Sequence, residues 1–340
     1  MLNILLTYDY ELFFNKSFAS EKDVLIKPAY DIAKALSKEG VSATFFVDTP
    51  SVLAYKRNGL ETYPKLVKEQ VQFLLDTKHD VQLHIHPIWY KSPYNNGEWN
   101  FNNDFYALKT FPNVADILIE SKACLDELAD GNSNYKCCAF RAGGFCYSPV
   151  KEVTDTLISL GITIDSSVCK NLKMETYSQE FDYTQTPAKY NWFFDSKGMF
   201  QESTEKQRLF EIPIGTYSRI PNKWIFTHFM PKLVFPPRKG LSSPTVEKKK
   251  SSRFDHVKAS FTTPVLFTND SLHANALLKI VEFYEKKAKK NDIYIAVIAH
   301  PKLSSDVCVA NTVSFIRLVK EKCHNTRFVT TKDVESLEKL

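Results

Sequence analysis

Short apolar runs alternate with segments of helical periodicity along nearly the whole chain, and this alternation limits the fold more than any other feature. The runs that we interpret as strands are 3–8, 41–48, 80–86, 136–141, 162–165, 209–214, 293–299 and 327–330. The segments with helical spacing are 23–38, 61–77, 113–129, 273–289 and 306–322. Strands that alternate with helices form a parallel sheet with helices outside, and 340 residues suit a closed or nearly closed α/β barrel.

Serine, proline and glycine residues at helix ends predict one further helix and mark the end of another. Ser148 is expected to cap the added helix, with Pro149 in its first turn, and Gly161 closes it. Gly40 ends the helix that begins near residue 23. The strand–helix order therefore continues through the middle of the chain.

Two stretches interrupt this order. The first, 87–111, is rich in aromatic residues: Trp89, Tyr90, Tyr94, Trp99, Phe101 and Tyr106. The second, 216–271, contains a Pro-Pro-Arg-Lys-Gly run at 236–240 and three lysines at 248–250. We predict a single barrel domain over 1–340 with insertions at about 87–111 and 216–271. The basic tract has two interpretations, contact with anionic lipid headgroups or phosphates, and the commoner solvated loop.

Composition excludes several classes of protein. Hydrophobic residues make up 44% of the chain, enough for one buried core, and a net charge of +5 is too small to indicate a nucleic-acid partner. The seven cysteines include no Cys-x-x-Cys pair, so we expect reduced core thiols and neither disulfides nor a thiolate metal site.

The first residues run from Met1 to Asp9 without a basic segment followed by a long apolar stretch, so we interpret them as a strand and not as a signal peptide. No run of about 18 apolar residues occurs, and no transmembrane helix is expected. The expectation is a cytoplasmic protein that meets its substrate in the cytosol or, by peripheral contact, at the inner membrane surface.

Two pairs of polar residues follow the same pattern at the ends of predicted strands. Asp9 and Glu11 lie two positions apart, as do His84 and His86, and side chains at this spacing on a strand point to the same face. Imidazole nitrogens and carboxylate oxygens are common ligands of zinc and related divalent ions. Exposed acids at a strand end and structural histidines are the alternatives.

Position favours a shared site. In α/β barrels the functional groups gather at the carboxyl ends of the strands, and both pairs occur there together with Arg141, Asp165 and His300. A metal held by one carboxylate and two imidazoles keeps room for water and makes hydroxide available near neutral pH. His300 is placed to act as an acid, and Arg141 can orient a carboxylate such as Asp9.

These residues occur within motifs that resemble those of the polysaccharide deacetylase superfamily, the NodB-homology or carbohydrate esterase family 4 type. In order along most of the chain, the matching segments are Thr7-Tyr8-Asp9-Tyr10-Glu11, Gly40–Val47, His79–Pro87, Phe140-Arg141-Ala142-Gly143-Gly144, Asp165-Ser166-Ser167, Glu211-Ile212-Pro213 and Ile298-Ala299-His300-Pro301.

The resemblance implies a distorted (β/α)7 barrel and hydrolysis of an acetyl group, usually an N-acetyl group on an amino sugar. It implies that Asp9 is the base, that Arg141 holds it, that His300 is the acid and that Asp165 tunes His300. The metal ligands would be Glu11, His84 and His86. The family usually has adjacent acids in the first motif, a second histidine four residues after the first, where Ile88 stands here, and Arg-x-Pro-Tyr in the third motif.

A cytosolic substrate would be a nucleotide-linked or lipid-linked amino sugar used to build a surface polysaccharide. Trp89, Tyr90 and Trp99 follow the histidine motif and are expected either to stack on a sugar ring or to pack within their loop. Two other functions stay open. One is a glycoside hydrolase on a related barrel, and the other is a non-catalytic carbohydrate-binding protein on a degenerate barrel.

Overall fold

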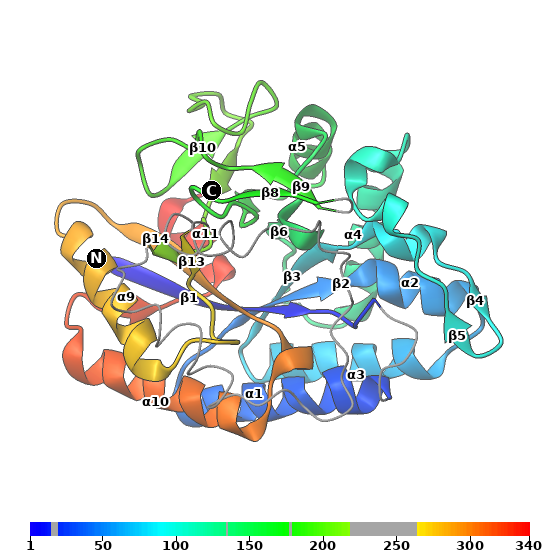
Figure 1. The fold of residues 1–340 in the computed structure, drawn as a ribbon, viewed down its shortest axis with the longest axis horizontal. Helices are drawn as coiled ribbons and strands as arrows, with labels where there is room; N and C mark the ends of the chain where they lie inside the picture. Colours follow the sequence, from blue (N-terminus) through cyan, green and yellow to red (C-terminus); the bar gives the residue numbers. More distant parts are fainter. Residues whose placement is uncertain (15–19, 134, 177–178, 218–263) are drawn as a thin grey trace, which may run out of the picture.

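A computed structural model describes residues 1–340 except 15–19, 134, 177–178 and 218–263. The predicted basic tract at 236–250 lies outside the described residues. Figure 1 shows a central sheet with helices along its outer side and with the two chain ends on the same side of the molecule.

Seven parallel strands build the centre of the molecule. They are β1 (Leu2–Tyr10), β2 (Thr44–Asp48), β3 (Asp80–Ile85), β6 (Ala139–Ala142), β7 (Ile164–Asp165), β11 (Leu209–Glu211) and β14 (Ile293–Ala299). Their order in the sheet is β11-β7-β6-β3-β2-β1-β14. At the margins β10 (Trp192–Phe194) pairs antiparallel with β11, and β15 (Thr326–Phe328) pairs parallel with β1. Each remaining strand belongs to a two-stranded hairpin or ladder: β4 (Tyr94–Asn95) with β5 (Glu98–Trp99), β8 (Lys173–Glu175) with β9 (Glu180–Asp182), and β12 (Thr216–Tyr217) with β13 (Val265–Leu266).

The two ends of this curled sheet meet through a short seam. Ile214, just beyond β11, forms a parallel bridge to Ala296 of β14. The Gly215 amide donates to the Ala296 carbonyl at 2.9 Å, and the Ala296 amide donates to the Pro213 carbonyl at 3.0 Å. The predicted distorted (β/α)7 barrel is therefore confirmed, with its distortion at the β11–β14 junction.

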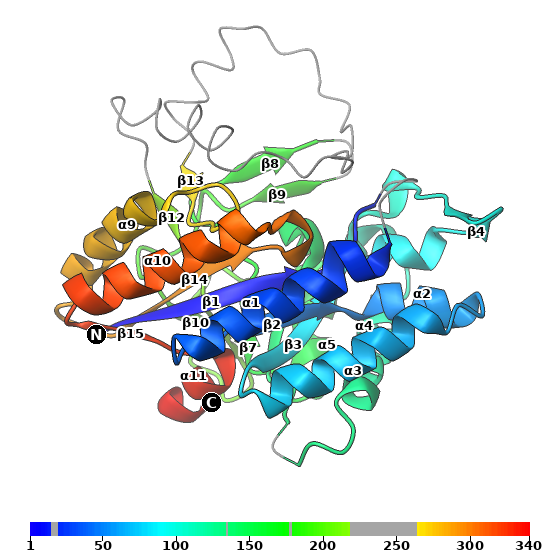
Figure 2. The ribbon, with the colours of Figure 1, turned by 90° about the horizontal axis from the view of Figure 1, so that it is seen from below.

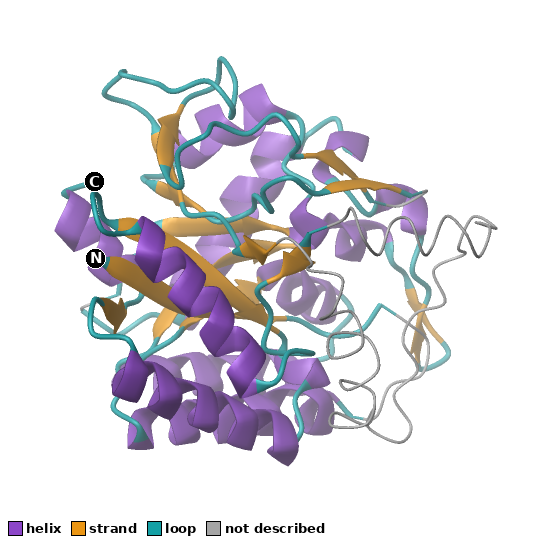
Figure 3. Ribbon diagram, turned by 60° about the vertical axis from the view of Figure 1, so that its left-hand side comes forward, coloured by secondary structure: helices purple, strands orange, loops and turns teal. Residues whose placement is uncertain are grey.

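Helices cover the outer face of the barrel, as Figures 2 and 3 show. They are α1 (Lys27–Lys38), α2 (Thr49–Arg57), α3 (Thr62–Asp76), α4 (Val114–Leu128), α5 (Val150–Ser159), α9 (Ala274–Lys287), α10 (Asp306–Lys322) and α11 (Thr331–Glu338). A π-helical turn, η1 (Lys22–Ile26), leads into α1, and short 3-10 turns follow strand ends at η2 (Pro87–Lys91), η5 (Gly143–Phe145) and η7 (Pro301–Leu303). Two more 3-10 turns, η3 (Asn103–Phe105) and η4 (Leu108–Thr110), lie in the first insertion.

Burial explains the sequence pattern of the strands. Every residue of β1 and of β14 is buried, as expected for parallel strands covered on both faces. The helix α1 turns Ala29, Ile32 and Leu36 toward the core, which is the predicted spacing. All seven cysteines are buried free thiols.

Three details differ from the predictions. Pro149 is the N-cap of α5, whose side-chain cap is missing, so Ser148 does not cap that helix. The helix α2 follows β2 without a loop, and α11 is the last helix of the described residues; neither was predicted from the sequence, because both are short. Within the described residues, no helix is long and apolar enough to cross a bilayer.

Candidate active site

The acidic pair lies at the carboxyl end of β1. Asp9 lies within β1, and Glu11 is the first residue after the strand. The two residues are 3% and 5% exposed. Both carboxylates face the end of β3. The Oδ2 atom of Asp9 lies 3.9 Å from Nε2 of His84, and Oε2 of Glu11 lies 3.2 Å from the same nitrogen.

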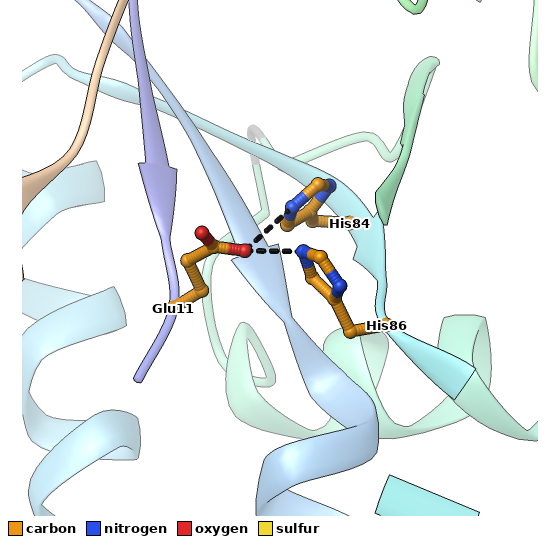
Figure 4. A group of neighbouring side chains, drawn as sticks. All are labelled: Glu11, His84 and His86. Atoms are coloured by element: carbon orange, nitrogen blue, oxygen red, sulfur yellow. Dashed lines mark hydrogen bonds and ion pairs between the residues drawn. The ribbon is translucent and has the colours of Figure 1, made fainter. Parts of the chain in front are cut away.

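The imidazole pair lies at the end of β3, and Figure 4 shows both rings turned toward Glu11. His86 Nε2 contacts the same Glu11 Oε2 atom that His84 approaches. One ligand atom from each of Glu11, His84 and His86 lies within 4.8 Å of the others. His84 Nδ1 lies 2.8 Å from the Arg141 carbonyl, so Nδ1 carries a proton and Nε2 is the nitrogen directed at the site.

Lys302 also reaches Glu11, and the sequence analysis missed it. Its ammonium lies 2.7 Å from Oε1 of Glu11 and donates to the Leu12 carbonyl at 3.1 Å. The rings of Phe13 and Phe14 each lie 5.2 Å from the ammonium. Burial opposes the negative charge on Glu11, but Lys302 and then His86 outweigh it and hold the pKa of Glu11 well below its usual value. Glu11 therefore stays ionised, with Oε1 on the lysine and Oε2 on the imidazoles.

Arg141 holds Asp9 from the neighbouring side of the barrel. Its Nη1 donates to Asp9 Oδ1 at 2.6 Å and to Thr7 Oγ1 at 2.9 Å, and its other donors bind the backbone and hydroxyl oxygens of Ser166. Burial opposes the charge on Asp9, but Arg141 outweighs it and lowers the pKa of that carboxyl. Asp9 is thus an ionised carboxylate whose Oδ2 faces His84 and His300.

His300, just beyond β14, completes the group. Its Nε2 lies 3.8 Å from Asp9 Oδ2 and 3.6 Å from Glu11 Oε1, and its side chain is 20% exposed. Nδ1 lies 2.6 Å from Asp270 Oδ2, and the His300 amide donates to the other Asp270 oxygen at 2.9 Å. Burial opposes the imidazolium, but Asp270 outweighs it and raises the pKa of His300 to about 9.

The carboxylate that contacts His300 is therefore Asp270, and the expected link from Asp165 to His300 is corrected. Asp165 accepts hydrogen bonds from the amide and hydroxyl of Ser167, and it interacts with Glu211 on the neighbouring strand. Asp270 escaped the sequence analysis because it lies in an irregular segment between β13 and α9, where no periodicity marks it.

Comparisons with known proteins bear on the fold. No protein-family profile and no curated protein matches the chain. Among solved structures, a protein from Parabacteroides distasonis assigned as a glycoside hydrolase/deacetylase matches with a TM-score of 0.56 at 10% identity, over 99% of this chain and 70% of that one. The chain has the polysaccharide deacetylase-type fold.

Two further solved structures match over nearly the whole of this chain. A protein from Mycobacterium smegmatis assigned as a polysaccharide deacetylase matches with a TM-score of 0.47 at 12% identity, over 98% of this chain and 89% of that one. A 4-alpha-glucanotransferase from Thermococcus litoralis matches with a TM-score of 0.51 at 8% identity, over 98% of this chain. The chain spans 40% of the length of that enzyme. Identities this low speak for the fold alone.

Within the deacetylase-type fold, Asp48 at the end of β2 supports the histidine motif. Its Oδ1 accepts from the His86 amide at 2.8 Å and its Oδ2 from the Trp89 indole at 2.8 Å. Burial raises the pKa of Asp48 to about 6. Its position, an acid at a strand end, was the available signal in the sequence.

The aromatic side chains of the first insertion form a packed cluster. Trp89 and Trp99 are 2% and 4% exposed, and their ring centroids lie 5.1 Å apart. Tyr90 is half-buried, and its hydroxyl donates to Glu120 at 3.1 Å under the Arg57 guanidinium. Of the two expectations for these rings, packing within the loop describes Trp89 and Trp99, which other side chains cover, and sugar stacking stays a prediction for the half-buried Tyr90.

The group formed by Glu11, His84 and His86 fits a divalent cation in its donor chemistry. One carboxylate oxygen and two imidazole nitrogens, with an open fourth position, is the donor set of many catalytic zinc sites. The His84 tautomer and the ionised state of Glu11 both suit that use. Asp9 and His300 approach the same space from two sides.

Proposed function

We propose that this protein is a metal-dependent hydrolase that removes an N-acetyl group, or a related acyl group, from an amino sugar. The observation that carries the proposal is the convergence of Glu11, His84 and His86 on one small volume that Asp9 and His300 border. An acid, a base and a metal-ligand set in contact are what amide hydrolysis requires.

In this proposal Glu11, His84 and His86 hold the cation, most simply zinc. When bound, the cation supplies Lewis acidity, which makes hydroxide available near neutral pH and polarises the acyl carbonyl. Lys302 holds Glu11 Oε1 and so directs Oε2 to the imidazoles. The Arg141 carbonyl keeps the His84 ring in the tautomer that ligation needs.

Asp9 and His300 move the protons. Arg141 donates to Asp9 Oδ1, which leaves Oδ2 free to act as the base. Oδ2 takes a proton from the attacking water while the water oxygen bonds to the acyl carbon. The imidazolium of His300, held by Asp270, gives its Nε2 proton to the leaving nitrogen as the C–N bond breaks. Acetate and a free amine result, and proton exchange with solvent returns Asp9 and His300 to their starting states.

The substrate class rests on the deacetylase-type fold and on the family resemblance. We propose a nucleotide-linked or lipid-linked amino sugar, a precursor of a surface polysaccharide, and we place the reaction in the cytoplasm. An acyl group on a sugar nitrogen would place that nitrogen beside His300, which donates the proton.

One experiment tests the proposal and its alternatives together. The purified protein is assayed for bound metal and then screened for acetate release over nucleotide-linked N-acetyl sugars. We expect one bound divalent ion and acetate released without cleavage of any glycosidic bond. Cleavage of a glycosidic bond would indicate a glycoside hydrolase, and sugar binding without metal or turnover would indicate a carbohydrate-binding protein; either result overturns the proposal.

A further inference from the structure

The strands that carry His86 and the arginine motif run side by side. The strand β3 pairs in parallel with β6, with His84 opposite Arg141 and Ile85 opposite Ala142. Continued by one residue, this register places His86 beside Gly143, where both chains leave the sheet. Because His84, His86, Arg141 and position 143 alternate regularly along their strands, they share the inner face.

Gly143 provides space that no side chain would leave. A Cβ atom at this position would lie 2.7 Å from His86 Nδ1 and 2.5 Å from the Ile85 carbonyl oxygen. Both distances are shorter than the 3 Å that real Cβ atoms keep from other heavy atoms, so a side chain at position 143 would force its neighbours to move. Gly143 is therefore needed for close approach and not for an unusual backbone angle.

The two histidines are held in different ways, so the orientation of the His86 ring depends on the space beside it. The Nδ1 atom of His84 is tied to the Arg141 carbonyl at 2.8 Å. The Nδ1 atom of His86 is buried and has no hydrogen-bond partner among the described residues. The His86 ring is oriented instead by packing against Phe14, with centroids 4.5 Å apart, and against Tyr106 at 5.5 Å.

The next residue, Gly144, makes room in the same way for Tyr106, one of the two rings that pack against His86. Gly144 has φ of +57°, and a Cβ atom there would lie 2.6 Å from Cε1 of Tyr106. The two glycines together admit the imidazole of His86 and the aromatic ring that backs it.

We propose that Gly143 is a positioning residue, which sets the His86 imidazole as the second nitrogen ligand of the metal. The inference rests on the proposed function, since it concerns the same Glu11, His84 and His86 site. It also explains why Gly143 and Gly144 come so soon after Arg141 in a chain whose second histidine, His86, lies only two residues after the first. A histidine ligand this close to the end of β3 needs a residue without a side chain at the facing position, just beyond β6.

The test compares Gly143→Ala with the matched control Gly198→Ala, where the added Cβ would lie 3.6 Å or more from its neighbours. Zinc affinity is measured by competition with a chromophoric chelator, and thermal unfolding is followed on the metal-free proteins. We expect G143A to weaken zinc binding by about 10- to 100-fold, the range for changes that disturb ligand orientation. The G198A protein should bind zinc as the wild type does.

A second comparison shows that the effect passes through the ring. In a His86→Ala background, adding G143A should cause no further loss of zinc affinity, because the ligand it positions is already gone. If G143A alone fails to fold, the double variant should be more stable than G143A, because the clash with the ring is removed while the close approach to the Ile85 carbonyl remains.

The outcomes separate the two proposals. If the wild type does not bind zinc or a related ion, the proposed function fails. If the wild type binds zinc and G143A binds it equally well, or if the losses in the double variant add, Gly143 does not position His86 and this inference fails while the proposed function stands. A double variant that is no more stable than G143A overturns it too.

Discussion

At the scale of single residues, three carboxylates of the site lie against a cationic side chain. Arg141 lies on Asp9, Lys302 on Glu11, and His300 on Asp270. For Asp9 and Glu11 this pairing keeps the carboxylate ionised where burial would otherwise favour the neutral acid. It also leaves one oxygen of Asp9 and one of Glu11 directed at the shared space.

His84 is the residue on which the metal site most depends, because its tautomer is set by the Arg141 carbonyl. His84→Ala should reduce bound metal from about one ion per chain to near zero and should abolish acyl release. Metal analysis and an acetate assay check this, with exposed His324→Ala as the control. Turnover that survives in H84A would mean that the mechanism is wrong.

His300 should affect rate and not metal content. His300→Ala removes the proton donor and should lower kcat by about 10²- to 10⁴-fold with unchanged metal stoichiometry. Asp270→Asn, which loses the charge that holds His300, should lower kcat less than H300A does. Metal loss in H300A equal to that in H84A would identify His300 as a ligand.

Lys302 should matter most when no metal is present. Lys302→Met leaves the buried Glu11 carboxylate without its cation, which should cost the metal-free protein about 3 kcal/mol of unfolding free energy. Added zinc should recover part of this loss, since the cation takes over the compensation of charge. Denaturant unfolding with chelator and with zinc measures both values, and exposed Lys289→Met is the control. Equal unfolding free energies for K302M and the wild type without metal would contradict the prediction.

At the scale of secondary-structure elements, the carboxyl ends of adjacent strands bring like charges together as well as opposite ones. Asp165 at the end of β7 lies opposite Glu211 at the end of β11. Burial first, and then Asp165, raises the pKa of Glu211 well above its usual value. Glu211 therefore keeps its proton to a higher pH in the folded protein than in the unfolded chain.

This pair makes stability depend on pH with a definite sign. Above about pH 4.3 an unfolded glutamate has lost its proton while the folded pair keeps it, so stability falls as pH rises toward the folded pKa. Glu211→Gln imitates the protonated acid and should remove a slope of about 1.4 kcal/mol per pH unit. Unfolding free energies of wild type and E211Q, measured across this range, should diverge in favour of E211Q as pH rises. Parallel curves would mean that the pair holds no extra proton.

At the scale of the whole molecule, the barrel depends on a narrow seam. It is closed by backbone hydrogen bonds around Ile214, Gly215 and Ala296, and the Phe267 amide donates to the Gly215 carbonyl at 2.7 Å. The strand β14, which leads to His300, pairs directly with β1, which carries Asp9, and the seam joins β14 to the β11 end of the sheet. The seam therefore joins the two end strands of the sheet, one of which leads to His300.

Gly215 is the residue at which that closure can be tested. A Cβ atom there would lie 2.8 Å from two side-chain carbons of Phe267, so Gly215→Ala overpacks the seam. We expect a loss of about 1–3 kcal/mol in unfolding free energy. Chemical unfolding of G215A beside G198A checks this, and equal stabilities would show that the seam yields without cost.

Local pattern was enough to predict the barrel and the residues at its mouth. Strand and helix periods are short-range properties, and parallel strands bring their carboxyl ends to one edge whatever their exact partners. For this reason Asp9, Glu11, His84, His86, Arg141 and His300 could be named from sequence. The aromatic residues at 89–99 could not be assigned, because the same ring type serves packing and sugar binding alike.

What only the tertiary structure decided is which side chains meet. Lys302 reaches Glu11 across 291 positions of sequence, and Asp270 reaches His300 across 30. Neither contact follows from a repeat in the sequence, because each depends on barrel closure and on irregular segments. Sequence alone determined where the polar groups stand along the strands; the closed sheet decided their partners, because contact distance is set by three-dimensional packing and not by position in the chain.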